Sequence, residues 1–386
     1  MSAPREVPFG RPWIGDEERA AVLRVLGGHI LTHGPECKAF ETDFAAFAGA
    51  GAHAVSLSSC MAGLHLAYLQ LGIGPGDEVI LPALTHVAAA HGVEWVGARP
   101  VFVDPEAATG NLGAEAVAAA ITPRTRAISL VHFVGIPCDM DAILAVAEKH
   151  GLKVIEDCAI ALGARWRGTH VGLLGDAGTF SFYPVKHITT GEGGMLLTRH
   201  RAVADAVGKL RAFGVDRTYA ERSVPGLYEV PALGLNYRMS EMQAAMGRAQ
   251  LGRLAEILRR RRENFAAVAE GLRGLRGVRV LDARNADAQQ SHYCLVAVLE
   301  GAGVEARNAV VAKVNAAGVG TSVYYPQPVP RMLYYRSKYG YAGEQFPVAT
   351  SISDGSVALP VGPHLSVEDV QHVARTFRTV VEEARG

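Results

Sequence analysis

Short β-rich segments alternate with alanine- and leucine-rich helical segments from about residue 52 onward. Several β-rich segments, such as 127–131, are almost entirely apolar, as expected of strands that are covered on both faces. This alternation predicts an α/β fold with a mostly parallel sheet and helices on both sides of it. We expect strands at 53–57, 78–81, 100–103, 127–131, 153–156, 172–183 and 194–198, and helices at 61–71, 87–96, 114–121 and 139–150.

The character of the sequence changes after Asn236. The segment 239–272 is typical of one or two long helices, and the remainder is typical of a smaller α+β unit. We therefore expect a large domain over residues 1–250 and a small C-terminal domain over residues 251–386. Four consecutive arginines at 259–262 lie between Glu256 and Glu263, so we interpret them as a solvated helix face and not as a nucleic-acid site.

Charge and composition favour a protein that binds a small molecule over one that binds nucleic acid or a membrane. Lys plus Arg and Asp plus Glu each number 38, so no overall field attracts nucleic acid or an anionic membrane. The N-terminal residues lack the apolar run of a signal peptide, and no uncharged stretch reaches membrane-spanning length, so we expect a cytoplasmic protein. The five cysteines form no CxxC pair, and we expect reduced thiols.

One lysine has an apolar, glycine-rich setting. Lys186 follows Phe182, Tyr183 and Pro184, and glycines stand at 191, 193 and 194. An amine held away from water loses its proton more readily and can then condense with an aldehyde. A surface lysine in a turn is the ordinary alternative, but the position next to a strand favours a chemical role.

An acidic residue follows the strand at 153–156. Asp157 must find a cation or hydrogen-bond donors there, because a buried charge without a partner is costly. Two interpretations stay open from this position alone. The carboxylate caps the next helix, or it keeps the nitrogen of a pyridine ring protonated, so that the ring accepts electrons. Together with Lys186, the second interpretation predicts a site for pyridoxal 5'-phosphate (PLP).

Two further strand ends carry candidate contacts to the cofactor. Ser59, Cys60 and Met61 open a helix after the first strand, and the free N–H groups of such a helix can bind a phosphate. A plain serine N-cap is the alternative. His86 follows the second strand, where its ring either lies on an aromatic ligand or caps the next helix. No group of histidines has the spacing of a metal site, and we expect no metal.

These residues stand among motifs that resemble the DegT/DnrJ/StrS family of PLP-dependent sugar aminotransferases. The likeness runs from about Val7 to the C-terminus. Its landmarks in chain order are Gly34-Pro35, Phe40-Glu41, Gly76-Asp77-Glu78-Val79, His132-Phe133-Val134-Gly135, Glu156-Asp157, Ser181-Phe182, Lys186, Thr190-Gly191-Glu192-Gly193-Gly194, Asn236-Tyr237-Arg238-Met239 and Leu359-Pro360. The resemblance implies the aspartate-aminotransferase-like fold of type I PLP enzymes, and a homodimer whose subunits share their active sites.

The resemblance also implies a role for each matched position. Lys186 forms the covalent link to PLP and then carries the proton between substrate and cofactor, while Asp157 pairs with the ring nitrogen. His86 stacks on the ring. The phosphate is surrounded by Ser59, Cys60, Met61 and Ser181, and by Asn236 of the partner subunit. Dehydratase relatives have histidine at the position of Lys186, so the lysine favours amino transfer.

The sequence departs from the family pattern in four places. Ile160 stands where many members have glutamine, Met61 where many have threonine, and Tyr183 where histidine is frequent. The late loop at 324–330 lacks its usual histidine. These changes leave the chemistry intact and bear on the identity of the substrate.

The function implied by the resemblance is transfer of an amino group from L-glutamate to a keto group of a nucleotide-linked deoxy-sugar. Such a reaction serves the biosynthesis of amino sugars for lipopolysaccharide, other surface polysaccharides or secondary metabolites. Tyr324, Tyr325 and Arg331 are candidate substrate contacts. The alternatives are a keto-cyclitol or keto-octulosonate acceptor, a PLP-dependent sugar dehydratase, and a PLP-fold protein that only binds or regulates.

Overall fold

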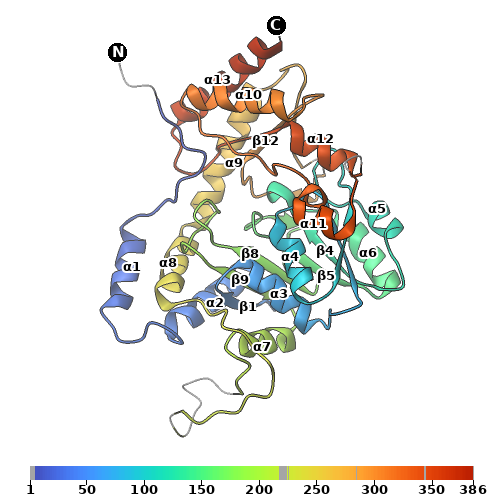
Figure 1. Cartoon of the computed structure of the whole chain (residues 1–386). Coiled ribbons are helices and arrows are strands. Elements are labelled where there is room, and N and C mark those ends of the chain that lie inside the picture. Colours follow the sequence, from blue (N-terminus) through green and yellow to red (C-terminus); the bar gives the residue numbers. More distant parts are fainter. Residues whose placement is uncertain (1–4, 217–223, 225, 284, 343–344, 386) are drawn as a thin grey trace.

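The computed structural model describes residues 5–216, 224, 226–283, 285–342 and 345–385. A seven-stranded sheet lies at its centre, in the order β1-β9-β8-β5-β4-β2-β3 (Figure 1). Strand β9 is antiparallel to both of its neighbours, and the other neighbouring pairs are parallel. The predicted α/β class is therefore confirmed. The strands are β1 His53–Leu57, β2 Glu78–Pro82, β3 Arg99–Val103, β4 Thr125–Val131, β5 Lys153–Asp157, β8 Ala177–Ser181 and β9 Gly194–Thr198.

Helices cover both faces of this sheet. Val79 and Leu81 of β2 enter one hydrophobic core and Ile80 enters another, because successive side chains of a strand point to opposite faces. One face carries α3 (Cys60–Gln70), α4 (Val87–Trp95) and α7 (Arg201–Leu210). The other carries α2 (Pro35–Ala48), α5 (Ala114–Ala119), α6 (Met140–His150) and α8 (Glu241–Gly252).

Most of the expected elements of the sheet layer begin and end within two residues of the prediction. Strand β8 is the exception, since it begins at Ala177 and not near residue 172. The residues before it turn so that three of their N–H groups meet the carboxylate of Glu156. The long helical region contains two helices, α8 and α9 (Leu254–Gly271), which are separated by Arg253.

A second core lies around a three-stranded antiparallel sheet of β10 (Val278–Val280), β12 (Leu295–Leu299) and β13 (Ser356–Leu359). Helices α10 (Val304–Ala316) and α13 (Val367–Arg385) lie near the top of Figure 1 beside this sheet. Helix α9 contributes to two cores. Ile257 packs in the core between the seven-stranded sheet and α2, and Val268 packs in the second core. Val7 also belongs to the second core. The division of the chain at residue 250 stays a prediction.

The remaining elements are short or peripheral. Helix α1 packs against α8, where Ala21 and Val25 meet Ala245. None of the described helices combines the length and the apolar composition that crossing a membrane requires. The bounds are α1 Asp16–Leu26, η1 Phe133–Gly135, β6 Arg165–Trp166, β7 Thr169–His170, β11 Ala288–Gln289, η3 Val329–Arg331, α11 Leu333–Tyr339 and α12 Pro347–Gly355.

Candidate active site

A buried carboxylate stands at the carboxyl end of β5. Asp157 is 4% exposed, and its Oδ1 accepts the N–H of Ala159 at 2.9 Å. The thiol of Cys60 lies 3.9 Å from the same oxygen. Within the described chain Asp157 forms no ion pair, so burial raises its pKa, against the opposing effects of the Ala159 N–H and of Lys186. A cationic group placed here would offset that cost.

Lys186 lies near this carboxylate. The loop that carries it follows β8, and the Lys186 N–H donates to the carbonyl oxygen of Tyr183 at 2.9 Å. Its Nζ lies 5.3 Å from the centre of the Tyr293 ring. Burial lowers the pKa of Lys186, while Cys60 and Asp157 act in the opposite direction. The amine is therefore easier to deprotonate than an amine in water, as the sequence predicted.

The N-terminus of α3 supplies an anion site beside these two residues. Ser59 is the N-cap, and its hydroxyl accepts the N–H of Ala62 at 3.1 Å. The N–H groups of Cys60 and Met61 have no hydrogen-bond acceptor among the described residues. Gly194 permits this arrangement, because a Cβ there would lie 2.3 Å from the carbonyl carbon of Ser59. Ser59 therefore caps α3, and the N–H groups of Cys60 and Met61 stay available to an anion.

His86 combines a cap with an aromatic contact. Its Nδ1 accepts the N–H of Ala88 at 3.2 Å, so it caps α4 as the plainer interpretation expected. Its ring also meets the Tyr325 ring edge-on, with centroids 5.8 Å apart. The ring of Tyr325 in turn contacts Phe133 and Tyr324. His86 can therefore cap α4 and contact an aromatic ring at the same time. Its stacking on a cofactor stays a prediction.

Three of the other predicted contacts already have hydrogen-bond or ion-pair partners. Tyr324 is buried, and its hydroxyl bonds that of Tyr293 at 2.7 Å. Arg331 forms an ion pair with Asp354 at 3.0 Å, so one end of its guanidinium is already engaged. Ser181 is half-buried at the end of β8, where its hydroxyl accepts the N–H of Tyr183 at 3.4 Å.

Asn236 is exposed on the segment that follows α7, where it forms an isolated bridge with Ala212. No hydrogen bond joins its side chain to the described residues of its own chain. An exposed amide is what a contact with a partner subunit would need, and that contact stays a prediction.

Sequence reasoning missed three residues of this neighbourhood. Tyr293 supports Lys186, Cys294 influences the Lys186 pKa, and Thr179 accepts the thiol of Cys60 at 3.3 Å. Thr179 could have been found, because it lies on the strand predicted at 172–183 and pairs with Asp157. Tyr293 and Cys294 lie just before β12, far from Lys186 in the sequence, so no local pattern links them to the lysine.

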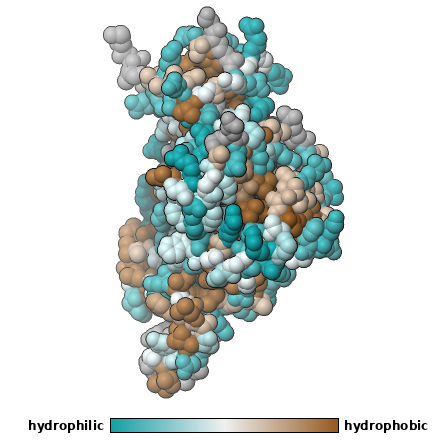
Figure 2. Space-filling view, turned by 45° about the vertical axis from the view of Figure 1, so that its right-hand side comes forward, coloured by the Kyte–Doolittle hydropathy of each residue, from teal (hydrophilic) through white to brown (hydrophobic). Residues whose placement is uncertain are grey.

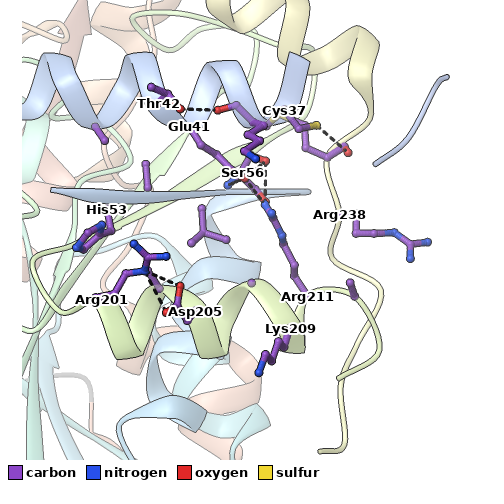
Figure 3. Close-up of a pocket in the computed structure, with 18 of the residues that line it drawn as sticks. Cys37, Glu41, Thr42, His53, Ser56, Arg201, Asp205, Lys209, Arg211 and Arg238 are labelled. Atoms are coloured by element: carbon purple, nitrogen blue, oxygen red, sulfur yellow. Dashed lines mark hydrogen bonds and ion pairs between the residues drawn. The ribbon is translucent and has the colours of Figure 1, made fainter. Parts of the chain in front are cut away.

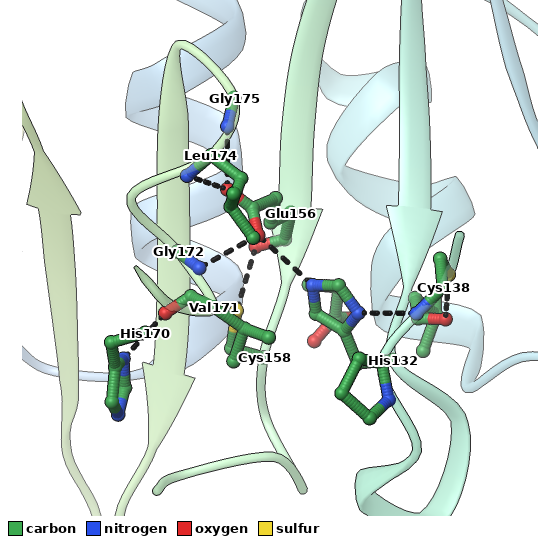
Figure 4. A network of polar contacts seen from close by, with 12 residues as sticks. His132, Cys138, Glu156, Cys158, His170, Val171, Gly172, Leu174 and Gly175 are labelled. Atoms are coloured by element: carbon green, nitrogen blue, oxygen red, sulfur yellow. Dashed lines mark hydrogen bonds and ion pairs between the residues drawn. The ribbon is translucent and has the colours of Figure 1, made fainter. Parts of the chain in front are cut away.

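A buried polar network lies behind the site (Figure 4). Glu156, His132 and Cys158 lie close enough to hold a metal ion. Both oxygens of Glu156 are nevertheless occupied by N–H donors, from the His132 ring and from the backbone of Gly172, Leu174 and Gly175. Burial would raise the pKa of Glu156, but these donors lower it overall. The donor set therefore fits an ionised carboxylate and leaves no oxygen lone pair directed at a metal.

A groove of about 1180 Å³ runs along the free edge of the sheet between α2 and α7 (Figure 3). The Ser56 N–H donates to Glu41 at 2.9 Å, and Arg211 bonds both Glu41 and the Ser56 carbonyl oxygen. Neither Lys186 nor Asp157 lines this groove. The side chains of Glu41 and Arg211 thus engage the N–H and the carbonyl oxygen of Ser56 at the edge of β1.

The residues around Lys186 fit PLP. The desolvated amine suits its aldehyde, the buried carboxylate of Asp157 suits its ring nitrogen, and the N-terminus of α3 suits its phosphate. This set, at the carboxyl ends of a mostly parallel sheet, defines the class of the protein as a type I PLP-dependent transferase. The chain matches the model of the DegT/DnrJ/EryC1/StrS aminotransferase family over residues 12–378, and it belongs to that family.

Known relatives are similar along the whole chain. The spore coat polysaccharide biosynthesis protein SpsC of Bacillus subtilis (strain 168) is 39% identical over 98% of both chains. The putative sugar aminotransferase Spr1654 of Streptococcus pneumoniae, in its PMP form, matches with a TM-score of 0.93 and 29% identity, covering 98% of this chain and 100% of that chain. Its PLP form matches with a TM-score of 0.91. DesV of S. venezuelae, in complex with a ketimine intermediate, matches with a TM-score of 0.88 and 35% identity over 97% of this chain and 99% of that chain. The chain is a sugar aminotransferase, and PLP is its cofactor.

Proposed function

We propose that this enzyme moves an amino group from L-glutamate to a keto group of a nucleotide-linked deoxy-sugar. The observation that carries the proposal is Lys186, desolvated and close to the buried carboxylate of Asp157, in a sugar aminotransferase. The names of the relatives support a sugar destined for a polysaccharide or a natural product, since SpsC is named for spore coat polysaccharide biosynthesis.

Each residue of the site has a distinct task in this proposal. Bound PLP supplies an electron sink for the carbon that gains or loses a proton. Lys186 holds the cofactor and then moves the proton at its Nζ, first from the donor and later to the acceptor. Asp157 keeps the ring nitrogen protonated, and His86 packs against the ring. The phosphate is held by Ser181, by the N–H groups of Cys60 and Met61 and the hydroxyl of Ser59, and by Asn236 of the partner subunit.

Tyr324, Tyr325 and Arg331 stay the proposed contacts to the sugar acceptor. The ring contact of Tyr325 with His86 supports its assignment, because His86 is proposed to pack against the cofactor ring. The Tyr324 hydroxyl bonds that of Tyr293, whose ring lies below Lys186. The structure gives Arg331 the weakest support of the three as a substrate contact, because Asp354 already binds one of its nitrogens.

Replacing Lys186 by alanine tests the central assignment. We expect Lys186→Ala to lose the visible absorbance of bound PLP that borohydride bleaches, and to lower turnover by about a thousandfold, because the amine proposed to move the proton is removed. Lys149→Ala, which changes an exposed lysine of α6, serves as the control and should match the unaltered enzyme. Full turnover by Lys186→Ala would overturn the assignment.

A panel of acceptors separates the proposal from its rivals. Glutamate is supplied with a nucleotide-linked keto-sugar, a keto-cyclitol or a keto-octulosonate, and 2-oxoglutarate and the aminated product are measured together. Amination of the nucleotide-linked sugar alone supports the proposal. Preference for another acceptor assigns that substrate instead, and ammonia release without aminated product assigns a dehydratase. A protein that binds PLP but converts no amino acid would be a binding protein.

We also propose that two chains form a homodimer with shared active sites. The described residues 226–235 carry exposed apolar side chains, including Leu227, Tyr228 and Leu233. Figure 2 shows hydrophobic surface at the lower end of the molecule. Leu233 is 94% exposed, which is unusual for a leucine in a soluble monomer. Asn236, the proposed contribution to the partner's phosphate site, follows three residues later.

Mixing two inactive variants tests whether the sites are shared. In a dimer of one Lys186→Ala chain and one Asn236→Ala chain, one site carries both changes and the other carries neither. Random exchange makes half of the dimers mixed, so activity should return to about a quarter of that of the unaltered enzyme. If Asn236 serves its own chain, both sites of every mixed dimer are impaired and mixing restores nothing.

A further inference from the structure

Glu156 is an ionised carboxylate whose hydrogen bonds all come from other segments. His132 Nε2 donates to Oε2 at 2.9 Å, and the Gly172 N–H donates to the same oxygen at 2.7 Å. The N–H groups of Leu174 and Gly175 donate to Oε1 at 2.8 and 2.7 Å. Each oxygen therefore accepts two hydrogen bonds in a fully buried position, which makes the carboxylate a strong local anchor.

The tautomer of His132 follows from its second contact. Its Nδ1 accepts the N–H of Cys138 at 3.1 Å and so carries no proton. The proton of the neutral ring must then be on Nε2, which donates it to Glu156. Neither bond requires a charged imidazole, so the anchor holds with a neutral histidine and an ionised glutamate.

The segments held by Glu156 are those on either side of Asp157. His132 follows β4, and its N–H donates to the carbonyl oxygen of Asp157 at 3.2 Å. The loop 172–175 leads into β8, where Thr179 pairs with Asp157 in the sheet. The Thr179 hydroxyl also accepts the thiol of Cys60, at the N-terminus of α3. The anchor thus reaches both strands that flank Asp157 (Figure 4).

Glu156 and Asp157 are consecutive residues of one strand, so their side chains point to opposite faces of the sheet. Glu156 cannot touch a cofactor on the Asp157 side. We infer that Glu156 is a positioning residue, which clamps β4 and the loop before β8 onto β5 and so fixes Asp157 against the ring nitrogen of PLP. The inference rests on the role of Asp157 in the proposed function.

The test uses the full-length enzyme loaded with PLP that carries ¹⁵N in the ring. Glu156→Gln keeps the size of the side chain but replaces one acceptor oxygen by an NH₂ group that faces backbone N–H donors. We expect the ¹⁵N resonance to move from the protonated towards the unprotonated position, and PLP to bind about tenfold more weakly. Asp157→Asn marks the fully unprotonated limit.

Asp176→Asn is the matched control. Asp176 belongs to the same loop and accepts the N–H of Val154 at 2.9 Å and the ammonium of Lys153 at 3.1 Å, at the opposite end of β5. The same oxygen-to-NH₂ change there should lower thermal stability but leave the ¹⁵N resonance unchanged. Equal resonances in Glu156→Gln and Asp176→Asn would overturn the inference, because Glu156 would then act on stability alone.

Two further outcomes are distinguishable. An unprotonated ring nitrogen in the unaltered enzyme would refute the role of Asp157 itself, and with it the basis of the inference. If Glu156→Gln does not fold, Glu156→Asp is measured instead. It keeps the charge but draws the oxygens back by one methylene, and it should shift the resonance in the same direction by a smaller amount. An unshifted resonance in Glu156→Asp would overturn the inference.

Discussion

His170 shows how burial fixes the state of a single side chain. Its ring is fully buried between Phe47 and Phe180, its Nδ1 lies 2.6 Å from the Val171 carbonyl oxygen, and its Nε2 accepts the N–H of Gly163 at 3.1 Å. Burial lowers the pKa of His170 to about 4 from the ordinary value of 6.5. The folded protein therefore keeps the ring neutral at pH values where an unfolded chain protonates it.

The lowered pKa of His170 makes the stability of the folded protein depend on pH. Between pH 6.5 and 4 the unfolded chain binds a proton at His170 that the folded chain does not, so the free energy of unfolding falls as the pH falls through this window. The contribution is at most about 3 kcal/mol. We expect His170→Gln to be less stable at neutral pH but to lose less on acidification, as measured by urea unfolding at several pH values.

His150→Gln is the control for this measurement. His150 is exposed at the end of α6, so its replacement should leave the pH slope of the unaltered protein in place. An unchanged slope in His170→Gln would show that groups other than His170 carry the acid sensitivity.

At the scale of residues, the sequence indicated candidate residues at strand ends but not the side chains around them. Asp157 ends β5 and Lys186 lies in the loop after β8, and the carboxyl ends of parallel strands meet at one edge of a sheet. The contact of Tyr293 with Lys186 could not be predicted, because Tyr293 lies just before β12 and no local pattern marks that packing. The roles of Ser59, Ser181 and Asn236 in binding phosphate stay predictions.

Helix α3 depends on a close approach by strand β9. A Cβ at Gly194 would lie 2.3 Å from the carbonyl carbon of Ser59 and 2.5 Å from the N atom of Cys60. These are backbone atoms that cannot rotate away. We expect Gly194→Ala to displace the first turn of α3, to cost about 1–3 kcal/mol of stability and to weaken PLP binding. Thermal unfolding and titration of the apoenzyme with PLP measure the two effects.

Gly252→Ala is the matched control for that change. An added methyl at Gly252 meets nothing within 4 Å, so both stability and PLP affinity should be kept. Normal PLP affinity in Gly194→Ala would mean that the first turn of α3 does not hold the phosphate.

At the scale of elements, periodicity predicted the strands well because they are buried on both faces and rich in β-branched residues. It placed the start of β8 too early, since Gly172 to Asp176 sit beside the strand without pairing in it. Their conformation is set by hydrogen bonds to Glu156 and Val154, which are distant in sequence. The sequence left open whether one or two helices span 239–272, and the structure has two, with the break at Arg253 directly after Gly252.

The exposed apolar side chains of residues 226–235 lead to a prediction about the oligomeric state. Leu233→Asp places a charge where the proposed dimer would bury a side chain, so we expect the dimer to dissociate and turnover to fall. Light scattering coupled to gel filtration measures the mass, which is 40.9 kDa for one chain. Val367→Asp, at a 71% exposed position that begins α13, should stay dimeric. A dimeric Leu233→Asp would place the interface elsewhere.

The sequence predicted only part of the way in which the whole chain is arranged. The change of pattern after Asn236 predicted a second unit, and a second core exists around β10, β12 and β13. What the pattern did not reveal is that Val7 crosses to that core, where its N–H donates to the Gly318 carbonyl oxygen at 2.8 Å. Such pairing over more than 300 residues leaves no local trace.

Helix α9 is embedded at Ile257 in one core and at Val268 in the other, and between them the buried Arg261 bonds the carbonyl oxygen of Tyr293 at 2.7 Å. Helix α9 therefore joins the two cores, and its Arg261 holds the residue whose ring lies against the Lys186 amine.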